Sequence, residues 1–328
     1  MSASKKRLIS AAVIGWSLMF SGAQAETLKF LIPWTPANES NHLTAEFVIN
    51  AVKNSSKGEL DLRLIGPSVV PPFKQLQPVG SGVFDIHYTS TAYHGEETGI
   101  GQLGDTITRD PDSRRTSGFW DMIDQHYQSK HNVKILGNGG STGYQFILKE
   151  AIGPDGGLKG RKIRSNPAYD DIITTLGGST VQTTAPQVYP SLQKGLIDGA
   201  AWTMHSVASN KLHEVAKYLA RPAFAVSTNL LVMNLDVWKK MTPERQKMFL
   251  EIGRAFEVAA YEIPAKIAAD DEAIMMKSGG AITQIGSQYA KDLNHIYNKG
   301  VWDRVIKQHV DDASKIVRLI EAGNLENK

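Results

Sequence analysis

In the first part of the chain, apolar positions follow strand and helix periodicities in turn. Residues 28–32 are a short apolar stretch, residues 43–53 repeat apolar positions at helical spacing, and residues 60–64 alternate apolar and polar positions with a period of two. A short helix over residues 73–79 and a strand over residues 83–89 follow. This alternating order predicts a parallel sheet with helices on its faces, as in α/β proteins.

The second part repeats this organisation after a segment without clear periodicity. Residues 95–115 are rich in Gly, Asp, Thr and Arg and are interpreted as a connection. The elements predicted beyond it are strands over residues 133–136 and 144–148, a second α/β unit that begins around Ile163, a helix over residues 185–194 and a strand over residues 196–202. Pro186 suits the first turn of that helix, and Gly195 suits its end.

One long amphipathic helix dominates the third part. Thr242-Pro243-Glu244 supplies the capping residue, the proline and the acid of a helix start. An apolar face continues from there almost to Gly279-Gly280, and Pro264 is expected to kink the helix. A helix of this length can touch two lobes at once. A final helix is predicted over residues 289–306.

The first 25 residues have the features of a cleavable secretory signal. Three basic residues at positions 5 to 7 precede the mostly apolar residues 8–20, and small residues stand at Ala23 and Ala25. The apolar run is short for a membrane anchor, although an uncleaved anchor stays an alternative. We expect cleavage between Ala25 and Glu26 and a mature chain in the periplasm that is not inserted in the membrane.

Without that segment the chain carries no net formal charge. Three of the 36 Lys and Arg residues lie in the segment and none of the 33 Asp and Glu residues does, so 33 of each sign remain. A nucleic-acid partner would need a concentrated basic surface and is not expected. The absence of cysteine excludes disulfides, thiolate metal sites and cysteine nucleophiles. A core must therefore stabilise the mature chain, whose length of roughly 300 residues suggests two lobes.

Catalytic motifs have little support in the sequence. Its nine histidines lack the spacing of a zinc protease helix, and no Gly-x4-Gly-Lys-Ser/Thr phosphate loop is present. Residues 139–143, GGSTG, match the short Gly-x-Ser-x-Gly pattern, but a predicted strand follows them in place of the helix that a nucleophile elbow needs. The carboxylate pairs Asp170-Asp171 and Asp270-Asp271 are interpreted as solvated surface, because adjacent residues on a helix do not face one site. An enzyme is therefore disfavoured, and no cofactor is expected.

Two stretches in the middle of the chain resemble one known family. They are LKGRKIRSNP at residues 158–167 and QVYPSLQKGLIDGAAW at residues 187–202. Together they resemble the most recognisable region of the solute receptors of tripartite ATP-independent periplasmic (TRAP) transporters, the DctP-type receptors. The matching residues are Lys159, Gly160, Lys162, Ile163, Arg164, Val188, Tyr189, Leu192, Gln193, Gly195, Asp198 and Gly199. Weaker similarity extends to GVFDI at residues 82–86 and NLDVWKKMTPERQ at residues 234–246.

The resemblance implies a two-lobed periplasmic-binding-protein-like fold of the α/β class, with hinge strands and a long helix spanning both lobes. The expected lobe I comprises residues 26–145 and about 228–280, lobe II comprises residues 146–227 and about 281–310, and residues 311–328 form a C-terminal tail or helix. The implied function is to capture a small organic acid anion and deliver it to the membrane permease subunits. A receptor for an ATP-driven importer or a sensor, and a secreted hydrolase or lyase, are the alternatives.

The resemblance also implies a carboxylate anchor. In the family this is the arginine that ends the Lys-x-Lys-Ile-Arg pattern, which here is Arg164. A guanidinium suits the role because its planar fork can form two parallel hydrogen bonds to a carboxylate. We expect Lys159, Arg161 and Lys162 to face solvent instead. A structural salt bridge is the alternative role for Arg164.

Two departures from the family pattern bear on the ligand. Gln145 stands where a second arginine is often found, and Trp202 stands where some receptors carry asparagine. One cation and an indole suit a ligand with a single carboxylate and an apolar or aromatic body, such as a keto or hydroxy acid. Some keto-acid receptors of the family use a cation, but Ala201 lacks the carboxylate that often precedes this tryptophan, so no metal site is predicted. Ordinary core packing is the alternative for Trp202.

The first lobe is expected to supply the other wall of the site. Tyr88 and Ser90 lie near a predicted strand end, and Trp34 lies in the loop after the first strand. Open α/β sheets bind ligands at such strand ends. Further candidates from nearby segments are Asn166, Tyr169, His205 and Asn229. Each of these residues could instead belong to the scaffold.

Overall fold

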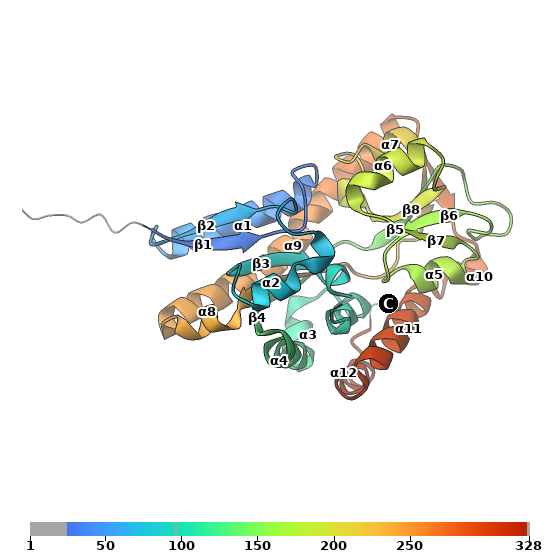
Figure 1. The fold of residues 1–328 in the computed structure, drawn as a ribbon. Helices are drawn as coiled ribbons and strands as arrows, with labels where there is room; N and C mark the ends of the chain where they lie inside the picture. The colour runs from blue at the N-terminus through green and yellow to red at the C-terminus, as the bar shows by residue number, and fades with distance from the viewer. Residues whose placement is uncertain (1–24, 96, 327–328) are drawn as a thin grey trace, which may run out of the picture.

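Two mixed β-sheets, each with helices packed on it, form two lobes joined by a hinge (Figure 1). The structure is a computed structural model that describes residues 25–95 and 97–326. The predicted signal segment, residues 1–25, lies outside the described residues except for Ala25. The predicted fold class, a two-lobed α/β protein, is confirmed.

The first sheet has the strand order β2-β1-β3-β10-β4. Its strands are β1 (Glu26–Leu31), β2 (Leu60–Ile65), β3 (Ile86–Ser90), β4 (Val133–Gly140) and β10 (Thr228–Asn234). As the sequence pattern predicted, β1 is parallel to both β2 and β3, but β10 is antiparallel to β3 and β4. The expectation of a parallel sheet is therefore wrong at this edge, because the chain returns from the second lobe and inserts β10 between β3 and β4.

The second sheet has the strand order β11-β9-β5-β8-β6-β7. Its strands are β5 (Tyr144–Leu148), β6 (Lys162–Ser165), β7 (Ser179–Gln182), β8 (Gly199–Thr203), β9 (Tyr218–Arg221) and β11 (Ala281–Gln284). β5 is antiparallel to β8 and β9, whereas β6 is parallel to β7 and β8. This sheet is therefore mixed as well.

Helices of very different lengths connect the strands. The α-helices are α1 (Glu39–Ser55), α2 (Leu76–Gly80), α3 (Pro111–Thr116), α4 (Phe119–His131), α5 (Asp170–Thr175), α6 (Ala185–Gln193), α7 (Leu212–Val215), α8 (Leu235–Lys240), α9 (Pro243–Lys277), α10 (Ser287–Ala290), α11 (Leu293–Gln308) and α12 (Val310–Ala322). The 3₁₀-helices are η1 (Pro72–Lys74), η2 (Thr91–His94), η3 (Ile100–Thr106) and η4 (Met204–Ser206). No helix of the described ranges is both long and apolar enough to cross a membrane.

The segment 95–115, interpreted as a connection, contains two of these helices, η3 and α3. All seven residues of η3 are buried, although Gly and polar residues make up most of it. A capping signal marks the start of α3, because Asp110 Oδ2 accepts a hydrogen bond from the Ser113 amide at 2.8 Å and Pro111 follows. The interpretation as a connection is therefore only partly right.

The long helix α9 contacts both lobes, as the sequence predicted. It packs on β4 and α1 in the first lobe and on η4 in the second. Gly253 permits the close approach to β4, because a Cβ atom at this position would lie 2.0 Å from the Leu136 carbonyl oxygen. One turn further on, the buried Glu257 carboxylate accepts hydrogen bonds from Arg115 at 2.8 and 2.7 Å and from the Asn138 amide at 2.9 Å. These contacts fix α9 against the first lobe.

Two crossing segments of the chain pair with each other at the hinge. Residues 141–143 lead from β4 to β5, and residues 222–227 lead back from β9 to β10. The amide of Ser141 donates to the Ser227 carbonyl at 2.6 Å, and Tyr144 and Phe224 exchange two backbone hydrogen bonds of 2.8 Å each. The hinge is therefore a short two-stranded connection, as the family resemblance implied.

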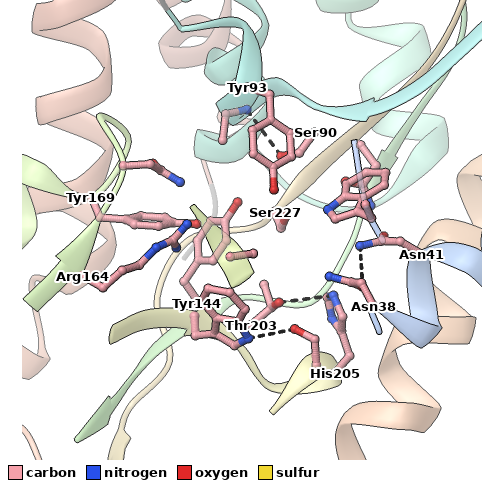
Figure 2. Close-up of a pocket in the computed structure, with 17 residues that line it drawn as sticks. Asn38, Asn41, Ser90, Tyr93, Tyr144, Arg164, Tyr169, Thr203, His205 and Ser227 are labelled. Carbon is pink, nitrogen blue, oxygen red and sulfur yellow. Dashed lines mark hydrogen bonds between the residues drawn. The ribbon is translucent and has the colours of Figure 1, made fainter. Parts of the chain in front are cut away.

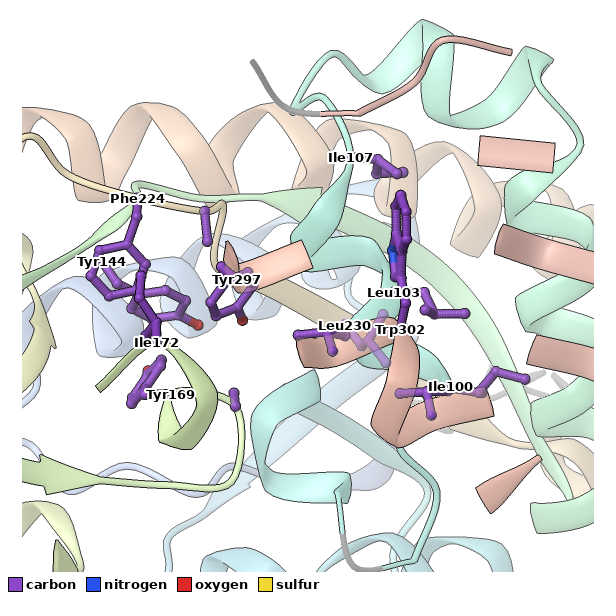
Figure 3. Close-up of a cluster of buried hydrophobic side chains, with 14 of the residues drawn as sticks. Ile100, Leu103, Ile107, Tyr144, Tyr169, Ile172, Phe224, Leu230, Tyr297 and Trp302 are labelled. Atoms are coloured by element: carbon purple, nitrogen blue, oxygen red, sulfur yellow. The ribbon is translucent and has the colours of Figure 1, made fainter. Parts of the chain in front are cut away.

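One apolar cluster runs across the hinge and joins the lobes (Figure 3). It contains Tyr144 and Phe224 from the hinge region and Tyr297 from α11, with a distance of 5.9 Å between the ring centroids of Phe224 and Tyr297. On the first-lobe side, Trp302 Nε1 donates to Thr106 Oγ1 at 2.9 Å. Helix α11 therefore packs on elements of both lobes.

The expected lobe boundaries can be compared with strand membership. Tyr144 and Gln145, expected in lobe I, belong to β5 of the second sheet. Within the range expected in lobe II, β11 pairs with β9 there, while α11 contacts both η3 and α5. The remaining boundaries stay a prediction.

Candidate functional site

A cavity lies between the two lobes, beside the hinge (Figure 2). It has about 550 Å³ of atom-free space, including its opening to solvent. The residues that line it are Trp34, Asn38, Asn41, Ser90, Ala92, Tyr93, Tyr144, Arg164, Asn166, Tyr169, Ala185, Trp202, Thr203, His205, Ser206, Ser227 and Asn229. Many of them stand at strand ends or in the loops that follow, where open α/β sheets bind ligands.

Arg164 is the cation of this cavity. Its side chain is buried, and 5% of the surface of the residue is exposed. Its Nε donates to the Thr183 carbonyl at 3.2 Å and its Nη1 to the Ala201 carbonyl at 3.3 Å. Within the described ranges neither Nη2 nor the guanidinium as a whole has a carboxylate partner. Burial lowers the pKa of Arg164, but the group stays charged.

No aspartate or glutamate of residues 25–95 and 97–326 is among those that line the cavity. Among these described residues, the only other lining side chain that can carry a positive charge is His205, whose pKa burial lowers from 6.5 to about 4. The imidazole is therefore neutral at pH 7, and it is held by Thr142 Oγ1 at 2.8 Å from Nδ1 and by Thr203 Oγ1 at 3.2 Å from Nε2. The described lining of the cavity thus carries one uncompensated positive charge.

We expect the replacement His205→Gln to reduce the loss of stability in acid. The folded-state pKa of about 4 lies below the ordinary value of 6.5. The stabilising contribution of the neutral ring is therefore complete above pH 6.5 and is lost as the pH falls toward 4, because the unfolded chain binds the proton more tightly. Between these values the wild-type chain should lose about 1.4 kcal/mol per pH unit more than the variant. Urea unfolding at several pH values measures this, and parallel pH profiles would contradict the neutral burial of His205.

Aromatic rings form much of the cavity wall. The Arg164 guanidinium carbon lies 4.8 Å from the centroid of the Trp202 ring, and Trp202 Nε1 donates to Ser206 Oγ at 2.8 Å. Tyr144 and Tyr169 pack edge to face with ring centroids 4.7 Å apart. Since the indole N–H is already used, Trp202 offers a ligand mainly apolar surface.

Eight of the ten predicted site residues line the cavity. They are Arg164, Trp202, Ser90, Trp34, Asn166, Tyr169, His205 and Asn229. Lys159 and Lys162 are exposed, as expected, whereas Arg161 is partly buried and donates from Nη1 to the Glu150 carbonyl at 2.6 Å. Arg161 does not line the cavity.

The other two predicted residues, Gln145 and Tyr88, do not line the cavity. Gln145 Oε1 accepts a short hydrogen bond from Arg221, which also pairs with Glu272. Side chains on a strand alternate between its faces, and the neighbour Tyr144 is the one that reaches the cavity. Tyr88 is fully buried, and its hydroxyl donates to Asn41 Oδ1 at 2.6 Å. The side chains of Gln145 and Tyr88 therefore do not reach the cavity surface.

Nine lining residues were not predicted as site residues. They are Asn38, Asn41, Ala92, Tyr93, Tyr144, Ala185, Thr203, Ser206 and Ser227. Several of them stand within a few positions of predicted ones: Ala92 and Tyr93 follow Ser90, and Thr203 follows Trp202. A prediction that also included the one to three residues after each candidate would have found Ala92, Tyr93 and Thr203. Asn38 and Asn41 lie where the loop enters α1, and no periodic signal marks them.

The described part of the chain has no group of three or more His, Asp or Glu residues that could hold a metal ion. The oxygen and nitrogen donors of the cavity wall are amides, hydroxyls and one neutral imidazole. Hard cations prefer carboxylate ligands, so this lining does not favour one.

Comparisons with known proteins agree on one family. The model of bacterial extracellular solute-binding protein family 7, DctP, matches residues 33–308. A solute-binding protein of Albidiferax ferrireducens is 24% identical over 307 residues, which cover 90% of this chain and 90% of that protein.

Two solved structures have the same fold. DctP7, a Bordetella pertussis extracytoplasmic solute receptor binding pyroglutamic acid, has a TM-score of 0.77 at 15% identity, with 90% of this chain and 100% of that chain covered. A TRAP periplasmic solute binding protein from Roseobacter denitrificans with bound β-D-glucuronate has a TM-score of 0.77 at 16% identity, with 90% and 99% covered.

Proposed function

This chain belongs to family 7 of the bacterial extracellular solute-binding proteins, the DctP-type receptors of TRAP transporters, and we propose that its ligand is a small organic anion with one carboxylate and a flat body. The receptor works in the periplasm after cleavage between Ala25 and Glu26, and it delivers the bound anion to the membrane permease. The observation that carries the ligand proposal is the buried Arg164 guanidinium without an acidic partner in the described ranges.

A buried charge without a counter-ion is costly, so the partner of Arg164 is expected to come from outside the chain. The two carbonyl contacts use Nε and Nη1 and leave both hydrogens of Nη2 and one hydrogen of Nη1 available. A carboxylate that accepts from Nη2 and from a neighbouring nitrogen would form the paired hydrogen bonds typical of arginine. The anion therefore completes the hydrogen bonding of Arg164 when it binds.

The charge of the lining favours a monoanion over a dianion. Arg164 supplies one positive charge, His205 is neutral, and no other ionised side chain of the described part of the chain lines the cavity. A second carboxylate would lose its hydration without a cation to meet it. This supports a ligand with a single carboxylate.

The aromatic wall favours a flat or ring-shaped ligand body. Trp202, Tyr144 and Tyr169 surround the guanidinium of Arg164 and present ring surface to the cavity. The ligands of the two structural neighbours, pyroglutamic acid and β-D-glucuronate, both carry one carboxylate on a ring. They support the proposal by analogy.

The replacement Trp202→Ala is expected to weaken binding of ring-bearing monocarboxylates by about 1–2 kcal/mol more than binding of acetate-sized acids, because buried apolar area grows with the ligand body. Trp238→Ala is the matched control, since Trp238 lies in α8 beside Lys134 and does not line the cavity. Calorimetric titration measures the losses. Equal losses for large and small acids would place Trp202 in the scaffold.

A thermal-shift screen of mono- and dicarboxylates tests the proposed function. A ligand at about 100 times its dissociation constant stabilises the folded protein by about 2.7 kcal/mol. We expect the largest shifts from ring-bearing monocarboxylates. If dicarboxylates or neutral sugars gave the largest shifts, the proposed ligand class would be wrong.

A further inference from the structure

The first-lobe wall of the cavity contains polar groups that the protein itself does not use. Figure 2 shows Arg164 on one side of the cavity and Asn38 on the other. Asn38 is 9% exposed and Asn229 is 3% exposed, and both line the cavity. Within residues 25–95 and 97–326, neither Asn38 Nδ2 nor the Asn229 side chain makes a hydrogen bond. Neither amide is among the fully buried side-chain atoms without a partner, so both face the open cavity, where a polar group of a ligand can replace water.

A chain of three side chains fixes the direction of the Asn38 amide. Tyr88 Oη donates to Asn41 Oδ1 at 2.6 Å, and Asn41 Nδ2 donates to Asn38 Oδ1 at 2.9 Å. Tyr88 is fully buried, and burial raises its pKa, so the hydroxyl keeps its proton. Ser40 Oγ makes a longer contact of 3.5 Å to the same Asn38 oxygen. The oxygen of Asn38 is thus occupied, and its NH₂ group faces the cavity as a donor.

Asn38 stands at a helix N-terminus, where its side chain would ordinarily form a capping hydrogen bond. Asn38 is the N-cap residue of α1, yet its side chain makes no capping hydrogen bond. Asparagine is among the best capping residues, because its oxygen can accept from the free amides of the first turn. Here that oxygen is turned to Asn41 instead. The local capping interaction is given up, and the amide is held toward the cavity.

We propose that Asn38 donates a hydrogen bond to a carbonyl oxygen at the end of the ligand remote from the carboxylate. Tyr88 and Asn41 act as positioning residues for the Asn38 side chain. This inference rests on the proposed function, because Arg164 must hold the carboxylate for the remote end to reach the first lobe. The selected class is an oxo acid, or an acid with an amide or ester carbonyl, in place of a purely apolar body. The carbonyl accepts from Asn38 Nδ2 when the lobes enclose the ligand.

Matched pairs of acids test the role of Asn38 without knowledge of the natural ligand. The probes are pentanoate and 4-oxopentanoate, cyclopentanecarboxylate and 3-oxocyclopentanecarboxylate, and 4-ethylbenzoate and 4-acetylbenzoate. Within each pair the acids have similar shape and differ by one acceptor oxygen. In at least one pair, the wild-type protein should bind the oxo acid at least about 10-fold tighter, because the acid without it leaves a buried donor unpaired.

Variants then assign this preference to residues. Asn38→Leu should abolish the preference for the oxo acid. Its affinity for the matched acid without the oxo group should stay within about 3-fold of the wild-type affinity. Asn38→Asp should weaken oxo acid binding further, since a carboxylate cannot donate. Tyr88→Phe should reduce the preference without changing the affinity for the acid lacking the oxygen, which a merely structural role would not do. Asn54→Leu on the exposed face of α1 is the control and should change nothing.

The outcomes separate this inference from the proposed function. Equal binding of both acids in every pair, or a preference that survives Asn38→Leu, would overturn the role of Asn38 and leave the monocarboxylate receptor intact. Failure of all six acids to bind wild-type protein would contradict the proposed function and this inference together. A collapse of the preference in Asn38→Leu and its reduction in Tyr88→Phe would support both assignments.

Discussion

Replacing Arg164 by alanine is expected to weaken binding of the best monocarboxylate by about 2–5 kcal/mol, the range typical for loss of one partner of a buried charge pair. The ligand carboxylate would keep its desolvation cost and lose its only cation. Arg164→Lys should recover only part of the loss, because an ammonium group keeps the charge but not the planar pair of donors. Calorimetric titration of each variant measures the affinities.

Arg161→Ala is the internal control for this prediction. Arg161 lies three positions earlier, outside the cavity, and bonds to backbone carbonyls of residues 150 and 151. Its removal should change ligand affinity by less than about 0.5 kcal/mol. Unliganded Arg164→Ala should remain folded, because no ion pair within the described ranges depends on it. An unaffected Arg164→Ala, or an equally damaged Arg161→Ala, would remove Arg164 from the role of anchor.

The second large effect concerns the attachment of the long helix. Glu257→Ala should lower the free energy of unfolding by about 3 kcal/mol, since it leaves a buried salt-bridge partner and a backbone amide unpaired. Glu257 is 2% exposed and accepts two hydrogen bonds from Arg115 and one from the Asn138 amide. The value is placed at the low end of the usual range because Arg115 is 24% exposed.

Glu251 supplies a matched control on the same helix. Its carboxylate is 65% exposed and lies 3.9 Å from Lys247 Nζ, one turn away. Glu251→Ala should change the free energy of unfolding by less than about 0.5 kcal/mol. Urea unfolding of both variants makes the comparison. If the two losses were similar, the contact between α9 and the first lobe would not depend on Glu257.

The sequence predicted elements whose pattern is local. Alternation in residues 60–64 and the apolar run in residues 144–148 correspond to β2 and β5, and the capping signal at Thr242 starts α9. The strand β10 was missed, because all seven of its residues are buried and a fully buried strand shows no alternation. Its place between β3 and β4 depends on contacts with residues far away in sequence.

Part of the cavity lining could be predicted from the family motif. Arg164 and Trp202 came from two matching stretches, and the structure places both at the cavity. Gln145 was also chosen by its place in a motif, but strand alternation turns its side chain away and brings Tyr144 to the wall. Asn38 and Asn41 could not be found in this way, because their direction depends on a hydrogen bond from Tyr88, 47 residues after Asn41.

The most direct test of the central claim compares three forms of one ligand. Wild-type protein is titrated calorimetrically with the best monocarboxylate, with its methyl ester, and with a diacid that carries a second carboxylate on the same skeleton. If the lone buried charge of Arg164 selects a monoanion, the acid should bind at least about 100-fold more tightly than the ester and the diacid, since each leaves one buried charge unpaired. Comparable binding of the ester or of the diacid would contradict the claim that one uncompensated guanidinium defines this site.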